Sequence, residues 1–288
     1  MSAVRNFGQD QSRAHVAMPD GSTHGLTTLL SHANHKQAKG AGFLSVGLTL
    51  TPRATGRAGR TLCSFATQGC AVACFADHDR LAWPQNKRVA VARTRLLAQA
   101  PATFFAMLVA ELTRAKVRAE RLGVKLVCRL NVVSDVAFER EFPDLFIHFT
   151  DVQFMDYTKD IRRMLNPQRP RNYHLTFSRS ERNEAECLRV LEAGHNVAVV
   201  FRCPPFPRLY WGYPVIDGDA HDFRFLDAGP GIIGLKAKGK GARTDQTGFV
   251  LDTVPLARPP VVSRSKVGGL PEGTSTTSLQ ATAKRRSV

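Results

Sequence analysis

Three cysteines, Cys63, Cys70 and Cys74, lie within twelve positions of a chain that has six cysteines in all. Thiolates are good ligands for soft metals, and three of them on one irregular loop can reach a single centre. Their spacing, C-x6-C-x3-C, lacks the paired C-x2-C units and the fourth ligand of a usual structural zinc site. A [4Fe–4S] cluster held by three cysteines would leave one iron open to another ligand. The segment therefore predicts an iron–sulfur site, and the alternative is that the thiols are small core residues.

The other cysteines and two histidines have weaker signals. Cys203 follows an apolar run and is either a fourth ligand of the cluster or a simple loop thiol. Cys128, in an apolar strand-like run, and Cys187, in a helix-like run, are expected in the core. His78 lies next to the cysteine segment and could form a hydrogen bond with a metal ligand. His174 alternates within a strand pattern and is expected to be structural.

The elements that must position these residues alternate between strand and helix patterns. Strands are predicted at 43–51, 125–131, 152–157, 173–178, 196–201, 213–217 and 231–237, and helices at 85–99, 101–123, 136–149, 160–165 and 181–194. Alternation at intervals of this length indicates βαβ units around a parallel sheet, so the fold class is α/β.

Polar side chains follow six of the predicted strands. They are Asn131, Ser134 and Asp135; Asp156, Tyr157 and Lys159; Ser178, Arg179 and Glu181; Arg202 and Cys203; Asp217 and Asp219; and Lys236, Lys238 and Lys240. In a (β/α) barrel all such strand ends meet at one mouth, whereas an open doubly wound sheet uses only those beside its switch point. Neither of the two common glycine-rich phosphate-binding fingerprints occurs. The sequence therefore favours a (β/α) barrel or partial barrel.

These strand-end residues are the candidate site. The candidate catalytic residues are Asp135, Asp156, Tyr157, Lys159, Asp217 and Asp219, and the candidate cofactor-binding residues are Asn131, Ser178, Arg179, Glu181, Arg202, Lys236 and Lys238. Converging carboxylates, with Asp222 and Asp227 among them, could hold Mg²⁺, although a polar turn explains the same run. A tyrosine can serve as a DNA-nicking nucleophile, but at a strand end it more often packs. The lysines suit a phosphate backbone or a solvated edge.

Charge and composition narrow the partners and the folded region. The chain of 288 residues has a net charge of +16, and the segment 255–288 supplies +5 of it, which leaves +11 for the rest. Such a field attracts nucleic acid or nucleotides, and the alternative is a well-solvated surface. Residues 255–288 and 1–40 are expected to be flexible, and 41–254 to form one folded domain. Without an apolar run that could span a bilayer, we expect the protein in the cytoplasm, that of the host if a phage encodes it.

Six stretches of the sequence resemble a known family. FLSVGLTLTP, LCSFATQGCAVACF, CRLNVVSDVAFE, VQFMDYTKD, NYHLTFSRSE and GIIGLKAKGK are similar to an uncharacterised family of phage and prophage proteins related to the Gene product 88 domain. The resemblance spans about 43–240. That family is distantly similar to three-cysteine phage proteins and to radical S-adenosylmethionine barrels, in which the cluster loop follows the first strand. The common motif there is C-x3-C-x2-C with an aromatic residue before the last cysteine, whereas here Phe75 follows Cys74.

Three functions remain open at this point. The first is an iron–sulfur, radical-S-adenosylmethionine-like enzyme that acts on nucleic acid or nucleotides in phage or prophage replication, with S-adenosylmethionine or another small ligand on the open iron. The second is a replication protein that binds or nicks DNA with Asp or Tyr residues and Mg²⁺, and whose cysteine site is structural. The third is a DNA-binding module without catalysis.

Overall fold

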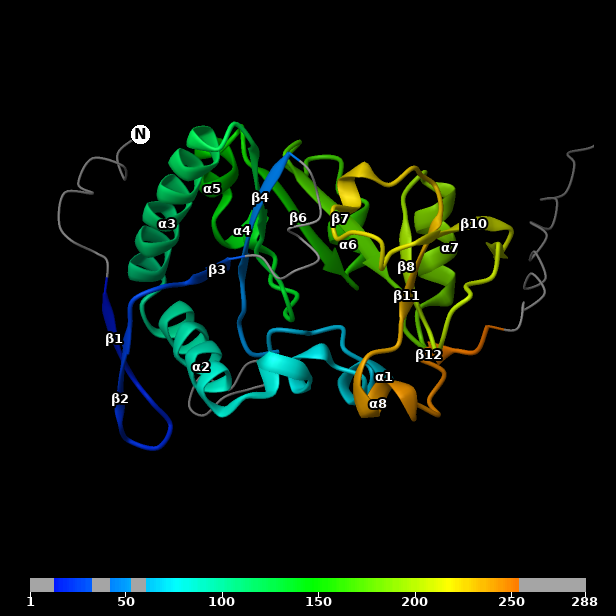
Figure 1. Ribbon diagram of the computed structural model, residues 1–288, viewed down its shortest axis with the longest axis horizontal. Coiled ribbons are helices and arrows are strands. Elements are labelled where there is room, and N and C mark those ends of the chain that lie inside the picture. Colours follow the sequence, from blue (N-terminus) through cyan, green and yellow to red (C-terminus); the bar gives the residue numbers. More distant parts are fainter. Residues whose placement is uncertain (1–12, 33–41, 53–60, 254–288) are drawn as a thin grey trace, which may run out of the picture. The chain divides into compact units, whose positions relative to one another are not determined.

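The computed structural model describes residues 13–32, 42–52 and 61–253 (Figure 1). The chain divides into units 1–257 and 258–288, so every described residue belongs to the first unit. The tail predicted to be flexible, 255–288, lies outside the described residues. No helix among the described residues is long and apolar enough to cross a membrane.

A mostly parallel sheet forms the centre of the fold. Its order is β3-β4-β5-β6-β7-β8-β11-β10-β9, and β12 pairs with β8 as well. The strands are β3 (Leu30–His32), β4 (Phe43–Leu48), β5 (Lys125–Arg129), β6 (Gln153–Thr158), β7 (Tyr173–Ser178), β8 (Val197–Phe201), β9 (Leu209–Tyr210), β10 (Tyr213–Asp217), β11 (Ile232–Lys236) and β12 (Val250–Leu251). From β4 to β10 every neighbouring pair is parallel. The predicted α/β class is confirmed.

The sheet does not close into a barrel within the described part of the chain. Closure would require β4 to pair with β10, the last parallel strand, but both already have an antiparallel partner on that side. The short strand β3 pairs with β4, and β9 pairs with β10. Of the two predicted alternatives, a barrel or a partial barrel, the closed barrel is therefore wrong, whereas the prediction of parallel strands is confirmed.

Helices connect the strands. They are α1 (Gln68–Val72), α2 (Pro84–Gln99), α3 (Pro101–Arg121), α4 (Phe138–Glu141), α5 (Pro143–His148), α6 (Ile161–Met164), α7 (Glu184–Glu192) and α8 (Gly239–Arg243), with 3-10 turns η3 (Phe75–Asp77), η4 (Asp79–Ala82) and η5 (Arg224–Leu226). Prolines begin α2 and α3, because the first helical position needs no backbone donor. The helix predicted at 136–149 splits in two because Pro143 lacks the N–H that would continue α4.

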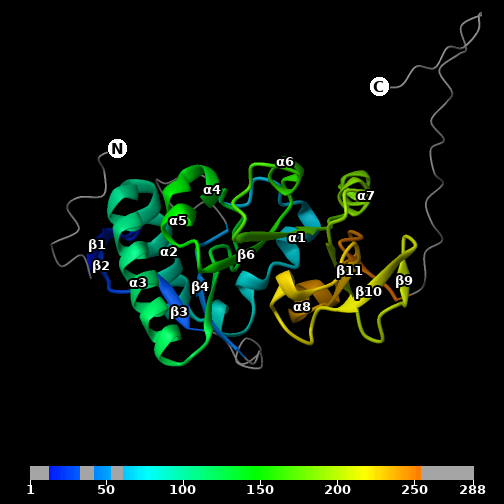
Figure 2. The same ribbon diagram turned by 90° about the horizontal axis from the view of Figure 1, so that it is seen from above.

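The two faces of the sheet differ in chemistry. Cys128, Phe154, Phe177 and other apolar strand residues pack with the helices in the main core, and Figure 2 shows α4 to α7 along one side of the strands. Partners in register between parallel strands share a face, so the other face has Ser45, Arg129, Tyr157, His174, Thr176 and Ser178. From β4 to β7 it is polar except for a small cluster around Val127, Met155 and Phe223, whereas on β8 and β11 it has the apolar residues Ala198, Val200, Ile233 and Leu235. The polar face is therefore the one free of connecting helices.

The described N-terminal residues, 13–32, are ordered, in contrast to the expected flexible segment. They form an antiparallel hairpin of β1 (Ala14–Ala17) and β2 (Thr23–Leu26), followed by β3. Val16 and Leu26 are buried in the main core. The Glu111 carboxylate on α3 accepts hydrogen bonds from the backbone N–H groups of Leu29 and Leu30 at 2.6 and 2.8 Å. Tertiary contacts with α2 and α3, rather than local pattern, order this segment.

Candidate metal site at the carboxyl edge of the sheet

The segment between β4 and α2 contains the three cysteines and begins beside the end of β5. The Asp135 N–H donates to the Leu62 carbonyl over 2.8 Å. The Cys63 thiol donates toward the Val133 carbonyl, with 3.7 Å between sulfur and oxygen. Because β4 and β5 are parallel, this contact places Cys63 at the carboxyl edge of the sheet.

Helix α1, which contains Cys70, is anchored by Glu181 beyond the end of β7. Thr67 Oγ1 donates to one Glu181 carboxylate oxygen over 2.6 Å, and the Gly69 N–H donates to the other over 2.8 Å. Burial alone would raise the pKa of Glu181, but these two hydrogen bonds lower it below its ordinary value. A Cβ at Gly69 would overlap the Thr247 side chain, so α1 can approach this closely only with glycine there.

The end of the cysteine segment contacts α8, which follows β11. A Cβ at Gly239 would overlap the His78 ring, and one at Gly241 would overlap the Val72 carbonyl oxygen. Gly239 also has a φ of +79°, which favours glycine. Figure 1 shows α1 and α8 next to each other at one end of the strands. The cysteine segment therefore extends along the carboxyl edge from β5, past β7, to β11.

The three thiols are half-buried and close enough to influence one another. Burial raises the pKa of Cys63 to about 12, and Asp135, Cys70 and Cys74 add to this rise, whereas Lys159 opposes it. The Cys63 thiol is therefore protonated at neutral pH, and any metal must displace its proton. Within the described ranges, no group of three His, Cys, Asp or Glu residues has the arrangement of a formed metal site.

The remaining cysteines lie elsewhere. Cys128 and Cys187 are buried in the main core, as predicted. Cys203 is exposed beyond β8, and its role as a fourth ligand stays a prediction.

Asp135, Lys159 and Ser178 are brought together beside Cys63. One Asp135 carboxylate oxygen accepts a hydrogen bond from the Lys159 N–H at 2.9 Å. The Lys159 ammonium donates to Ser178 Oγ over 2.9 Å and lies 5.7 Å from the centre of the Phe249 ring. These three side chains come from the ends of β5, β6 and β7, as the strand-end argument predicted.

Arg163 on α6 fixes the position of Asp135 in this group of three residues. Its guanidinium donates to Asp135 Oδ1 over 2.5 Å and to both Glu139 carboxylate oxygens over 2.7 and 2.9 Å. It also donates to the Tyr173 hydroxyl over 3.2 Å. The Arg163 side chain is 2% exposed and that of Glu139 is 5% exposed, so the network is buried. The sequence gives no signal for this network, because Arg163 lies in a short helix beside the exposed Arg162.

Asn131 and Asp156 are buried and form hydrogen bonds with each other. Their side chains are not directed toward the cysteines. The Asp156 carboxylate accepts from the Asn131 N–H, the Asn131 side-chain amide and the Tyr173 hydroxyl at 2.7, 3.1 and 2.7 Å. The Asn131 side-chain oxygen in turn accepts from Ser134 Oγ and from the Val136 N–H. Both residues order the loop after β5, and their candidate catalytic and binding roles have no support in this geometry.

Asp156 and His174 should give the stability of the fold opposite dependences on pH. Burial raises the pKa of Asp156 to about 6. Its contribution to stability is therefore complete below its unfolded pKa near 3.8 and is lost as the pH rises through 6. Burial, together with Arg169, lowers the pKa of His174 to about 4. Its contribution is complete above its unfolded value of 6.5 and is lost as the pH falls through 4.

We expect Asp156→Asn to remove the first of these dependences and to leave the second. The free energy of unfolding of the variant, relative to that of the natural sequence, should rise between pH 4 and pH 6 by on the order of 3 kcal/mol. Urea unfolding at a series of pH values measures it. Asp144→Asn, an exposed carboxylate on α5, is the control and should not alter the profile. Parallel profiles for Asp156→Asn and the natural sequence would contradict the expectation.

Arg179 and Arg202 anchor the described C-terminal residues to the same edge. The Arg179 guanidinium donates to the carbonyls of Gly248 and Phe249 over 2.7 and 3.1 Å, and it pairs with Glu184 at 3.0 Å. Arg202 donates to the carbonyls of residues 243 and 245 and to the Asp252 carboxylate. These bonds hold residues 243–252 across the strand ends, and cofactor binding by the two arginines stays a prediction.

Asp217, Asp219, Lys236 and Lys238 form a separate group at the ends of β10 and β11. Asp219 accepts from the Lys236 N–H and from the Lys238 ammonium, each at 2.8 Å, and its own N–H donates to Asp217. Lys236, Lys238 and Lys240 are exposed. The structure does not bring these carboxylates together with Asp135 or Asp156 in a metal-binding group.

Tyr157 lies on the polar face of the sheet rather than at its edge. The Arg129 guanidinium lies 5.0 Å from the centre of its ring. Burial raises the pKa of Tyr157, although Arg224 and Arg129 oppose the rise. A phenol with a raised pKa forms less of the nucleophilic phenolate at neutral pH, so the geometry gives no support to a nicking role.

Comparison with models of known protein families identifies a match. A family model described as Gene product 88 matches residues 24–253, which includes the cysteine segment and all parallel strands. Neither the curated proteins nor the solved structures contain a match to the chain.

Proposed function

We propose that this chain, which belongs to the phage-type Gene product 88 family, holds a [4Fe–4S] cluster on Cys63, Cys70 and Cys74 and is an enzyme acting on nucleic acid or nucleotides. One observation supports this most. The three thiols of one segment lie at the edge where the parallel strands end, and Cys70 and Cys74 are near enough to Cys63 to raise its pKa. In α/β proteins with parallel sheets, this edge is where sites are built.

The residues around the thiols suit a cluster. Cys63, Cys70 and Cys74 would hold three irons, and the cluster would supply an electron and an open iron for S-adenosylmethionine or another small ligand. His78 Nε2 is buried and has no hydrogen-bond partner among the described residues. A cluster beside this ring would supply a hydrogen-bond acceptor for Nε2, which no described residue does. Lys159 brings a positive charge that favours the thiolate form of Cys63.

The architecture supports comparison with a partial barrel. Five parallel strands follow one another in chain order from β4 to β8, and the cysteine segment follows the first of them. Connecting helices cover one face, whereas the other has Arg129, Tyr157, His174 and Thr176. In a barrel the helix-free face is the interior. We therefore place the substrate between this polar face and the cysteine segment.

Exposed aromatic side chains beside the cysteines support a nucleic-acid substrate. Phe65, Phe75 and Trp83 are 41%, 39% and 51% exposed, and all three lie in the cysteine segment. The Arg162 guanidinium lies 5.8 Å from the centre of the Phe65 ring, and Arg80 is exposed. Exposed rings that alternate with cations are typical of surfaces on which the bases of single strands stack. The net charge of +16 acts in the same direction.

We expect the double variant Phe65→Ala, Trp83→Ala to bind single-stranded DNA at least about ten-fold more weakly, because each lost ring removes a stacking surface. Fluorescence anisotropy of a labelled oligonucleotide at fixed salt measures the affinity. The control is Ile147→Ala, which removes a side chain that is 72% exposed on α5, and it should bind like the natural sequence. Equal affinity of the double variant and the control would rule out this surface as the binding site.

A further inference from the structure

A cavity opens at the amino edge of the sheet, opposite to the cysteines. Its volume is about 580 Å³, and it is lined where β6 and β7 begin, by the segment after α6 and by the turn before β8. Gln153 and His174 come from the strands, Arg169 and Arg171 from the segment, His195 from the turn and Phe225 from η5. None of the candidate site residues lines it, so the cavity is independent of the proposed cluster.

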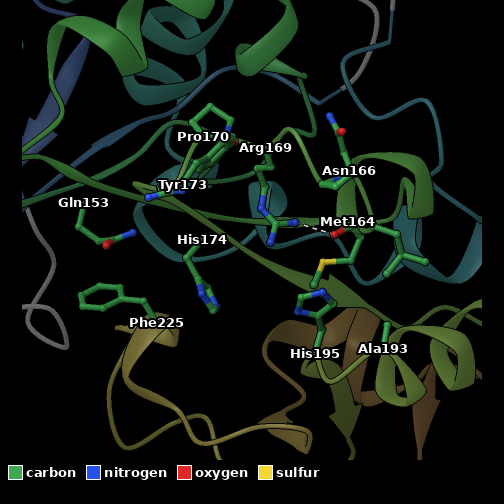
Figure 3. Close-up of a pocket in the computed structure, with 13 residues that line it drawn as sticks. Gln153, Met164, Asn166, Arg169, Pro170, Tyr173, His174, Ala193, His195 and Phe225 are labelled. Atoms are coloured by element: carbon green, nitrogen blue, oxygen red, sulfur yellow. Dashed lines mark hydrogen bonds between the residues drawn. The ribbon is translucent and has the colours of Figure 1, made fainter. Parts of the chain in front are cut away.

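The lining of this cavity is basic, with two arginines that are charged at neutral pH and two histidines. It includes Arg169, Arg171, His174 and His195, and no Asp or Glu is among its described lining residues. Figure 3 shows the Arg169 guanidinium directed toward the space between the His174 and His195 rings. Among the described residues, this guanidinium makes one hydrogen bond, to the Met164 carbonyl at 2.6 Å, and no ion pair.

Burial of the Arg169 cation without an ion-pair partner among the described residues is costly, and the same surroundings disfavour the charged form of the two histidines. Burial lowers the pKa of Arg169, and Glu139 only partly opposes this effect. Burial also lowers the pKa of His174 to about 4, and the charges of Arg169, His195 and Arg224 lower it further. Burial and the charge of Arg169 also lower the pKa of His195. An anion between these groups would pair with the Arg169 guanidinium and would favour the protonated form of both histidines.

We propose that this cavity binds a phosphate ester of nucleotide size, with the phosphate held by Arg169 between His174 and His195. Arginine matches phosphate with a planar fork of donors. The volume lies within the range of about 300–1,000 Å³ that is usual for small-molecule sites. The Phe225 ring borders the cavity in Figure 3 and offers an apolar surface to the rest of the ligand.

The test uses inorganic phosphate, adenosine 5′-monophosphate and adenosine as probes. Imidazole signals in heteronuclear NMR spectra are assigned from His174→Gln and His195→Gln and are followed as a function of pH and probe concentration. We expect phosphate and adenosine 5′-monophosphate to raise the pKa of His174 and His195, and adenosine to leave both unchanged. Adenosine 5′-monophosphate should bind more tightly than phosphate because it also contacts the apolar wall.

Arg169→Met should weaken binding of adenosine 5′-monophosphate at least about ten-fold, since the charge-assisted hydrogen bonds are lost. Arg114→Met removes the same charge from an exposed position of α3, which contributes nothing to the cavity, and should bind normally. If Arg169→Met does not fold, Arg169→Lys replaces it and should bind less tightly than the natural sequence. Unchanged histidine signals at about 10 mM of both phosphate probes would overturn the proposal, as would normal binding by the Arg169 variant.

Discussion

Replacing Cys63, Cys70 or Cys74 by serine should lower the iron content of anaerobically purified protein at least about ten-fold, because a hydroxyl is a poor substitute for a soft thiolate ligand. Each variant removes one of only three ligands, so the remaining two cannot retain the cluster. Iron and acid-labile sulfide per chain measure the effect. A melting curve for each variant shows whether the loss of iron precedes any loss of the fold.

Cys203→Ser is the matched control, because Cys203 is exposed beyond β8 and can be replaced without disturbing the core. It should retain the iron and sulfide of the natural sequence. If Cys203→Ser loses as much iron as the other variants, Cys203 is a fourth ligand and the cluster has no open iron. If all four variants keep their iron, the cysteine segment is not the metal site.

Arg163→Met should destabilise the fold by about 3–5 kcal/mol, a large share of the stability of an ordinary domain. The change leaves the carboxylates of Asp135 and Glu139 buried without their counter-charge. Because Asp135 also holds the Lys159 backbone, the variant should disturb the wall of the cysteine site. Urea unfolding at pH 7 measures the free energy.

Arg162→Met tests whether the loss of stability in Arg163→Met comes from the buried position of that arginine rather than from the loss of a positive charge. Arg162 is the next residue, and its side chain is 72% exposed, although it too is paired with a carboxylate, that of Asp160. Arg162→Met should cost less stability than Arg163→Met, because the buried Asp160 carboxylate keeps its hydrogen bond from the backbone N–H of residue 162 and its ion pair with Arg140. Similar losses in the two variants would show that the buried network stabilises the protein no more than the exposed Arg162 side chain does.

The sequence was sufficient to predict the parallel strands but not the edges of the sheet. Apolar runs such as those at 152–157 and 196–201 are long enough to predict buried strands, and β6 and β8 are found there. The edge strands β3 and β9 have three and two residues, too few for a detectable period. These short strands pair with β4 and β10, and this pairing prevents the sheet from closing.

Part of the candidate site follows from strand direction alone. Parallel strands place the residues after each strand at one edge, and Asp135, Lys159 and Ser178 meet there as predicted. Local sequence cannot show that Arg179 and Arg202 bind backbone carbonyls of residues 243–252, because those partners lie more than forty residues away. The residues that follow the strands could not predict the cavity, because its lining residues lie where β6 and β7 begin, after α6 and before β8.

Mössbauer spectroscopy of anaerobically purified protein, grown on the Mössbauer-active iron isotope, tests the [4Fe–4S] cluster and its open iron in one experiment. We expect nearly all iron to belong to one [4Fe–4S] cluster per chain. On addition of S-adenosylmethionine, roughly a quarter of the absorption should change its isomer shift, because one iron lacks a cysteine ligand. A cluster in which no iron changes its isomer shift on addition of any small ligand would contradict the open iron site. Isolated iron, or stoichiometric zinc without iron after anaerobic reconstitution, would contradict the cluster itself.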